Sequence, residues 1–281
     1  MANTVAMRDV AEKAGVSTAT VSRVLNKTRV SIPISEETKK RVLNICEELK
    51  FEPNIHARRF FLKKSETIGL IIPPQSQIQR SGVEHTFADY NIAEILSGVE
   101  EAVRIKGYKL LLIVVDEKVI ENKEYLRLMR NKSLDGLLLW GIGLNDKYVA
   151  EIIAEGFPLF LLNSRVDYSP VNFVSGDDQG GSFQVTAHLI DSGHRRIGYI
   201  RGLASSSVAG DRERGFKMAL ERSGLSLDND LIIGGNFSEE SGYLAMKKLL
   251  ALVDLPTAVV AVNDYTAIGA MKAIRERGLK V

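Results

Sequence analysis

The sequence predicts two fold classes in one chain: an N-terminal all-α helix-turn-helix domain and, after it, an α/β body of two similar subdomains. Charge and glycine content separate the two parts. Residues 1–66 contain 13 Lys/Arg against 8 Asp/Glu, whereas the rest of the chain contains 24 against 27. Of the 23 glycines, Gly15 alone precedes residue 66. Beyond that point, short apolar runs alternate with amphipathic stretches, which is typical of a mostly parallel sheet.

Composition excludes several protein classes. With 45% hydrophobic and 26% charged residues, the 281-residue chain is expected to form ordinary globular cores. Its longest apolar runs, 110–115 and 257–262, are far shorter than the roughly 20 residues of a membrane-spanning helix. The N-terminus reaches Asp9 without an apolar signal segment, and Cys46 is the only cysteine. We therefore expect a cytoplasmic protein with no membrane partner.

Three stretches of the first fifty residues have apolar side chains at helical spacing. The stripes are Met7, Val10, Ala11 and Ala14; then Val21, Val24 and Leu25; then Val42, Ile45, Cys46 and Leu49. Gly15 is placed to end the first helix in a left-handed conformation, and Ser17 and Ser35 are placed to cap the next two. Asn26 is expected to end the second helix. Because Cys46 lies within the third stripe, we expect a core thiol.

The short glycine-containing turn before Ser17 is typical of a helix-turn-helix motif. The face of the second helix opposite Val21 is small and polar, which suits a helix that enters the major groove of DNA. The candidate DNA contacts of this helix are Ser17, Thr18, Ala19, Thr20, Ser22, Arg23 and Asn26. Thr18 and Ala19 are placed for base edges, while Arg23 fits a guanine edge or a phosphate equally well. A small helical bundle with a solvated face is the alternative.

Several runs of this first part closely match a known family. They are Arg8-Asp9-Val10-Ala11, the run 14–26 (AGVSTATVSRVLN), the run 36–42 (EETKKRV), and Pro53-Asn54 followed by Ala57-Arg58. Together they resemble the lactose/galactose repressor (LacI/GalR) family of bacterial transcription regulators. The resemblance implies a homodimeric repressor that binds double-stranded DNA at a near-palindromic operator and is associated with the nucleoid. The longer stretch before Ser35 and the pair Lys50-Phe51 depart from the family pattern, but they alter a loop and a helix end.

Residues 51–66 are predicted to form a basic hinge or linker after a DNA-binding domain at 1–50. The resemblance adds Asn54, Ala57, Arg58 and Phe60 to the DNA-binding candidates. It also implies a short hinge helix in which the apolar residue at the position of Phe60 wedges a base step from the minor groove. The alternative is that Phe60 packs on the body of the protein together with Phe61.

The body is predicted to contain eight strands. Their expected positions are 67–72, 109–115, 136–140, 158–163, 173–175, 196–200, 231–234 and 257–262. Expected helical stripes comprise Ile92, Ile95, Leu96, Val99 and Val103, and Val185, His188 and Leu189. We place the subdomain boundary at 163/164, giving subdomains 67–163 and 164–281. The resemblance implies a periplasmic-binding-protein-like body of two Rossmann-like subdomains with an effector between them.

The sequence carries no recognisable catalytic, cofactor or metal motif. Gly141-Ile142-Gly143 lacks the third glycine of a dinucleotide fingerprint, and phosphate loops, nucleophile elbows and His/Cys clusters are missing. We therefore predict a binding protein without catalytic residues, cofactor or metal. The alternative is a cytosolic solute-binding receptor or a sugar-processing enzyme with a similar body. The missing signal peptide argues against the receptor, and the missing motifs argue against the enzyme.

Ligands of open α/β sheets bind beyond the carboxyl ends of the strands. Polar residues at those ends, sharpened by the resemblance, give these effector-binding candidates: Asn91, Asn163, Ser206, Arg212, Phe237 and Asn263. The resemblance implies that Phe237 stacks on a sugar or a base, and a sugar, a sugar phosphate or a purine would fit these side chains. Asn263 could instead cap the next helix, and Arg212 could lie on a solvated helix face.

Two further expectations concern the body. Asp177 and Asp178 are expected to cap a helix and to stay outside the effector site. The resemblance also implies a further strand after Val281, so we expect a C-terminally truncated body in which the second subdomain is incomplete.

Overall fold

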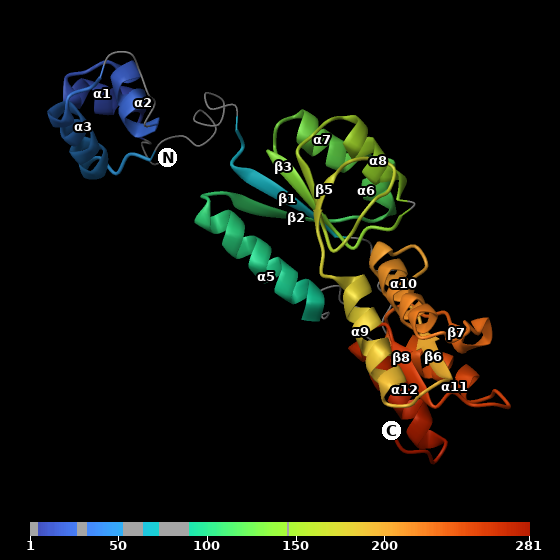
Figure 1. Cartoon of the computed structure of the whole chain (residues 1–281). Coiled ribbons are helices and arrows are strands. Elements are labelled where there is room, and N and C mark those ends of the chain that lie inside the picture. The colour runs from blue at the N-terminus through green and yellow to red at the C-terminus, as the bar shows by residue number, and fades with distance from the viewer. Residues whose placement is uncertain (1–4, 27–32, 53–63, 73–89, 145) are drawn as a thin grey trace. The chain divides into compact units, whose positions relative to one another are not determined.

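The computed structural model describes residues 5–26, 33–52, 64–72, 90–144 and 146–281 (Figure 1). Asn54, Ala57, Arg58 and Phe60, the predicted contacts of the hinge, lie outside these ranges. The chain forms two compact units, Met1–Ser65 and Glu66–Val281. Within the described ranges, every helix is too short or too polar to cross a bilayer.

The first unit contains three helices, α1 (Met7–Ala14), α2 (Thr18–Asn26) and α3 (Glu36–Glu48). Gly15 ends α1 with φ 64°, in the left-handed region that glycine adopts without strain. The Ser17 hydroxyl accepts a hydrogen bond from the Thr20 amide at 3.1 Å, and the Ser35 hydroxyl accepts one from the Thr38 amide at 3.2 Å. The predicted helix ends are therefore confirmed.

The three helices pack on one small core. Val10, Val21 and Val42, one from each helix, are completely buried. Cys46 lies in the same core as predicted, and burial raises the pKa of its thiol. The stripes read from the sequence thus face one another, and their opposite faces are left to solvent.

The first sheet of the second unit is parallel, with the strand order β2-β1-β3-β4-β5. Its strands are β1 (Thr67–Ile72), β2 (Lys109–Val114), β3 (Gly136–Trp140), β4 (Leu159–Leu162) and β5 (Asn172–Val174). The accompanying helices are α5 (Tyr90–Ile105), α6 (Glu117–Glu121), α7 (Glu124–Arg130) and α8 (Lys147–Ala154). The strand positions follow the apolar runs of the sequence.

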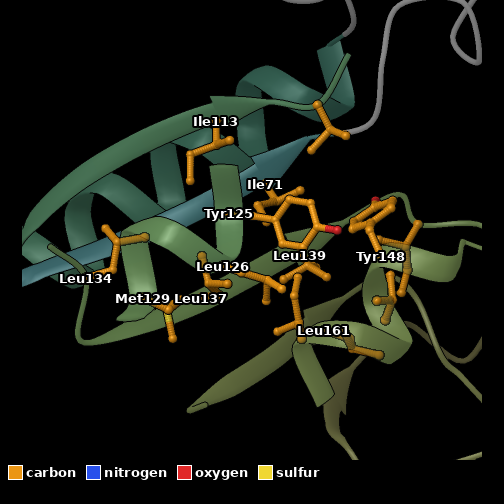
Figure 2. Packing of buried hydrophobic residues seen from close by; sticks show 14 of the residues in the cluster. Ile71, Ile113, Tyr125, Leu126, Met129, Leu134, Leu137, Leu139, Tyr148 and Leu161 are labelled. Carbon is orange, nitrogen blue, oxygen red and sulfur yellow. The ribbon is translucent and has the colours of Figure 1, made fainter. Parts of the chain in front are cut away.

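Alternating side chains of these strands build two cores. On one face, Leu70, Ile72 and Trp140 pack against Ile92 of α5. On the other face, side chains of β1, β3 and β4 pack against α7 and α8, as Figure 2 shows for Ile71, Leu139, Leu161, Tyr125 and Tyr148. Both faces of the parallel sheet are covered, which explains the nearly continuous apolar strands.

The second sheet is also parallel, with the order β7-β6-β8. Its strands are β6 (Ile197–Ile200), β7 (Ile232–Ile233) and β8 (Ala258–Ala261). The accompanying helices are α9 (Asp178–Asp191), α10 (Ser207–Arg222), the 3-10 helix Asn229–Leu231, α11 (Glu239–Leu249) and α12 (Asp264–Glu276). Tyr199 packs with α9 and α10, whereas Ile200 packs with α11 and α12. The two helix pairs therefore cover opposite faces.

Glycines bring the members of each helix pair into very close contact. Gly215 of α10 lies against the carbonyl oxygen of Gln179 on α9. Gly242 of α11 lies against the carbonyl oxygen of Thr266 on α12, and Gly269 of α12 lies against that of Glu239 on α11. A side chain larger than hydrogen has no room at these crossings.

The first sheet extends beyond the boundary predicted at 163/164, because β5 pairs with β4 in parallel register up to Val174. The predicted stripe of α9 is wrong, since Val185 is 54% exposed while Thr186 and Ile190 are buried. His188 is exposed too. The packing of α9 on Gly215 decides which side of this helix turns inward, and hydrophobicity alone does not reveal it.

Candidate functional site

The first candidate site is the outer face of α2. Ser17, Thr18, Ala19 and Arg23 are exposed, whereas Val21 on the opposite side is completely buried. The hydroxyl oxygens of Ser17 and Thr20 lie 3.0 Å apart at the start of the helix. Ser22 lies beside this face and is half-buried. The structure therefore brings the predicted residues of α2 together, while the side chain of Asn26 at its end lies outside the described atoms.

This face suits an acidic, grooved partner. Small side chains at the start of a helix allow close approach, and the free N–H groups of the first turn carry partial positive charge. Such a terminus attracts phosphate oxygens. Arg23, one turn further on, adds a full positive charge without crowding the first turn.

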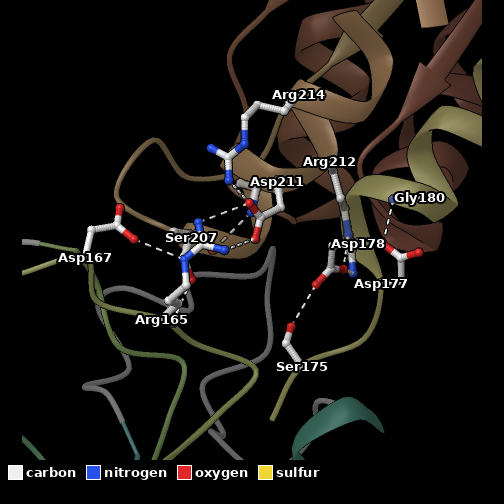
Figure 3. Close-up of polar contacts among 12 residues, drawn as sticks. Arg165, Asp167, Ser175, Asp177, Asp178, Gly180, Ser207, Asp211, Arg212 and Arg214 are labelled. Carbon is white, nitrogen blue, oxygen red and sulfur yellow. Dashed lines mark hydrogen bonds and ion pairs between the residues drawn. The ribbon is translucent and has the colours of Figure 1, made fainter. Parts of the chain in front are cut away.

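The second candidate site lies at the carboxyl ends of the strands of the second sheet. Arg212 of α10 donates from Nε to Oδ1 of Asp178 at 2.8 Å, and its Nη2 lies 2.8 Å from the same oxygen. Its Nη1 donates to the carbonyl oxygen of Val262, directly after β8, at 2.6 Å. Ser175 donates to the other carboxylate oxygen of Asp178 at 3.0 Å. We call Arg212, Asp178, Ser175 and Val262 the Arg212 network; Figure 3 shows the three side chains together.

Asn263 and Phe237 lie next to this network. The Asn263 side-chain oxygen accepts from the Thr266 amide at 3.0 Å, so Asn263 does cap α12. Its side-chain nitrogen donates to the Phe237 carbonyl oxygen, also at 3.0 Å. The Phe237 ring lies so close to Gly202, just after β6, that a Cβ at Gly202 would overlap it. Arg212, Phe237 and Asn263 are thus gathered at one end of the sheet.

The remaining effector candidates lie on neighbouring elements. Ser206 caps α10 by accepting from the Ala209 amide at 3.3 Å. Asn163 follows β4 with φ 45°, and its N–H donates to the Val174 carbonyl at 2.8 Å. Asn91 is exposed in the first turn of α5. Asn163 and Asn91 therefore belong to the first sheet and its helix α5, whereas Arg212, Phe237 and Asn263 lie at the second sheet.

The residues on either side of Ser206 contact the first subdomain. The Leu144 N–H, in the loop after β3, donates to the Ser205 carbonyl at 2.7 Å. The Arg165 N–H, in the loop after β4, donates to the buried Ser207 hydroxyl at 3.0 Å. The Arg165 guanidinium pairs with both carboxylate oxygens of Asp211, each at 3.3 Å. The segment that carries the predicted effector contacts of α10 is therefore tied to the first sheet.

Sequence reasoning missed Asp178. Asp177 caps α9 as expected, because its carboxylate accepts from the Gly180 amide at 2.8 Å. Asp178 was expected to remain outside the site, but its carboxylate binds Arg212. Two consecutive acids at a helix start give the same capping signal, and the sequence contains nothing that tells which of them meets an arginine from another helix.

A cavity of about 790 Å³ lies beside the Arg212 network. It is lined by Phe173 of β5, by Phe183 of α9 and by Met218 of α10, and it shares Ser175 and Asp178 with the network. Arg212, Phe237 and Asn263 are not among its lining residues. A ligand in this cavity would therefore not line up with these three predicted effector contacts. In the described ranges, His, Cys, Asp and Glu side chains form no group of three or more suited to a metal ion.

Two family models match the chain. Residues 6–54 match "Bacterial regulatory proteins, lacI family", and residues 65–281 match "Periplasmic binding proteins and sugar binding domain of LacI family". The chain belongs to the LacI family. The fold predicted from its sequence, helix-turn-helix helices before a parallel-sheet α/β body, is the fold of LacI-family structures and is confirmed.

Relatives and solved structures extend this match over the whole chain. The HTH-type transcriptional repressor PurR of Pasteurella multocida is 35% identical over 98% of this chain and 78% of the relative. The probable HTH-type transcriptional repressor ExuR of Bacillus subtilis is 33% identical over 99% of this chain and 78% of the relative. The lac repressor dimer bound to operator and an anti-inducer matches with TM-score 0.78 and 28% identity, over 99% of this chain and 79% of that one. The complex of the transcriptional regulator CelR with cellobiose matches with TM-score 0.69 and 29% identity, over 99% of this chain and 80% of that one.

Proposed function

We propose that this LacI-family regulator is a cytoplasmic, homodimeric repressor that binds a near-palindromic operator. A sugar or sugar derivative, bound between the two α/β subdomains, would control its affinity for DNA. The observation that carries the proposal is the coexistence in one chain of the polar α2 face and the polar cluster at the strand ends. The operator-bound lac repressor dimer and the cellobiose-bound CelR among the similar structures support the same pairing of activities.

The DNA-binding step follows from the chemistry of α2. Thr18 and Ala19 would reach base edges, while Ser17, Thr20 and the helix N-terminus would hold phosphates. Arg23, Ser22 and Asn26 would complete the contacts. The surplus of Lys and Arg in residues 1–66 would neutralise several phosphates, so binding should weaken steeply as salt is added. Two copies related by a two-fold axis would read two half-sites.

The hinge would couple the two sites. Asn54, Ala57, Arg58 and Phe60 would contact DNA from residues 51–66, with Phe60 wedging a base step. An effector that binds one arrangement of the subdomains more tightly than the other shifts the equilibrium by that difference in affinity. The contacts of Arg165 with Ser207 and Asp211 are among those that such a rearrangement would remake. Changed spacing of the two hinges would then change affinity for the operator.

Unused hydrogen-bonding capacity at the cluster supports an effector site there. The Arg212 guanidinium has five N–H groups and uses three of them in the described contacts. The Asn263 amide has one N–H and one lone pair beyond its two described bonds. Together with the Phe237 ring, these groups can bind the hydroxyls and the apolar face of a sugar. Ser206, Asn163 and Asn91 would contribute from neighbouring elements.

A thermal-shift screen tests the effector site. A sugar or purine present at about a hundred times its Kd should stabilise the protein by about 2.7 kcal/mol and raise its melting temperature by several degrees. Replacing Arg212 with Met should remove this stabilisation, because the guanidinium donors are lost. Arg214→Met, an exposed change on the same helix, should respond like the wild type. The effector assignment would be refuted by a ligand that protects wild type and Arg212→Met equally.

A further inference from the structure

We propose that Asp178 positions Arg212 and cancels its charge, so that the site selects an uncharged, hydroxyl-bearing effector over its phosphorylated form. This inference rests on the proposed effector function and names the class of ligand. It concerns a residue that sequence reasoning placed outside the site, and it follows from the geometry of the Arg212 network.

The guanidinium of Arg212 is held by groups from separate elements. Asp178, in the first turn of α9, accepts from Nε and faces Nη2, both at 2.8 Å. The Val262 carbonyl, at the end of β8, accepts from Nη1 at 2.6 Å. Asp178 is itself fixed by the Ser175 hydroxyl at 3.0 Å (Figure 3). The guanidinium plane therefore has one orientation, with its two remaining N–H groups left for a ligand.

Burial makes the charge balance of this pair important. The Asp178 side chain is 11% exposed and the Arg212 side chain 32% exposed. Charges removed from water interact strongly, and a buried charge is tolerated when it is paired. A ligand that reaches Arg212 therefore meets a neutral ion pair instead of a free cation.

Neighbouring cations near this site share their carboxylates. Arg201 lies 3.7 Å from Glu213, which also pairs with Lys217 at 2.7 Å. Arg165 and Arg214 share Asp211. A phosphate group carries about −1.5 to −2 charges at neutral pH. The Asp178 carboxylate, which faces the Arg212 guanidinium, would repel such a group.

A purely structural role for Asp178 is the competing explanation. Acids in the first turn stabilise a helix, but the capping position of α9 is already filled by Asp177. The Asp178 carboxylate instead accepts its described hydrogen bonds from Arg212 and Ser175. A structural role predicts a loss of stability alone when the charge is removed, whereas our proposal predicts a change in which ligands bind.

Asp178→Asn tests the proposal, with inorganic phosphate as the probe and ionic strength matched with sodium chloride. The substitution keeps the shape of the side chain and frees the guanidinium charge. We expect 10 mM phosphate to raise the melting temperature of Asp178→Asn by about 3 °C or more and to leave the wild type unshifted. Asp177→Asn is the matched control, because it removes the adjacent charge while asparagine still caps the helix. It should behave like the wild type.

The phosphate-induced shift in melting temperature is also measured for a double variant and for the wild type. Adding Arg212→Met to Asp178→Asn should abolish the gain, since Arg212 is the proposed phosphate partner. The proposal is overturned if phosphate stabilises the wild type through Arg212, or if Asp178→Asn responds no more than Asp177→Asn. If circular dichroism shows that Asp178→Asn does not fold, the effect of phosphate on the melting temperature is compared between the wild type and Arg212→Met. A phosphate-induced shift in the wild type that is absent from Arg212→Met would overturn the proposal. These phosphate measurements do not depend on identifying a sugar that binds. A failure of the effector screen can therefore be distinguished from a failure of this proposal.

Discussion

Replacing Ala19 with glutamate is expected to lower affinity for duplex DNA by roughly 100-fold, because like charges brought together at an interface cost several kcal/mol. Ala19 is exposed in the first turn of α2, where the proposed complex places base edges and phosphates. The fold should be preserved, since an acid in the first turn favours the helix. Fluorescence anisotropy with a labelled duplex, alongside circular dichroism, measures both quantities.

Asn44→Glu provides the matched control for Ala19→Glu. Asn44 is exposed on α3, and its replacement introduces the same side chain and the same change in net charge. Only a general electrostatic loss of less than about tenfold is expected there. Equal losses for the two variants would mean that α2 is not the element that enters the groove.

Replacing Gly242 with alanine should destabilise the second subdomain by about 1–3 kcal/mol or more, because the new methyl group would overlap the Thr266 carbonyl oxygen. Gly269→Ala should do the same, since its methyl group would overlap the Glu239 carbonyl oxygen. Separating α11 from α12 would open the core formed by Ala245, Met246 and Ala270. Thermal melting followed by circular dichroism reads the loss.

Gly181→Ala distinguishes close packing from a general effect of removing glycine. Gly181 lies within α9, and a Cβ placed there meets no atom within 4 Å. Alanine is favoured over glycine in a helix by about 1 kcal/mol, so this variant should melt at or above the wild-type temperature. A Gly242→Ala protein as stable as Gly181→Ala would contradict the tight α11–α12 crossing.

Much of the fold could be predicted from local signals. Gly15, Ser17 and Ser35 mark helix ends because backbone geometry and capping act over a few residues. The strands follow apolar runs because both faces of a parallel sheet are covered. The inward face of α9 escaped this reasoning, since it is set by contact with Gly215 on another helix. The pairing of β5 with β4 likewise depends on tertiary structure, because three mostly exposed residues carry little pattern.

In the candidate site, too, features with local signals could be predicted from the sequence, and features set by tertiary contacts could not. The position of Arg212, Phe237 and Asn263 at the strand ends could be predicted because ligands of open sheets usually bind there, and the structure gathers these residues at that end. Their contact with an effector stays a prediction. The contact of Asp178 could not be predicted, because Arg212 lies 34 residues further along the chain and gives no local sign of the pair at 2.8 Å. Long-range ion pairs arise from the way helices cross, and neither composition nor periodicity records them.

Repression by the proposed mechanism requires two copies of this chain to present α2 to one stretch of duplex DNA. The most direct measurement is selection of binding sites from random duplex DNA with the purified full chain at low ionic strength, followed by footprinting of the selected sequence. We expect a near-palindromic motif, a protected region with two-fold symmetry, and two chains per duplex. Failure to retain any duplex, or an asymmetric footprint made by a single chain, would contradict it.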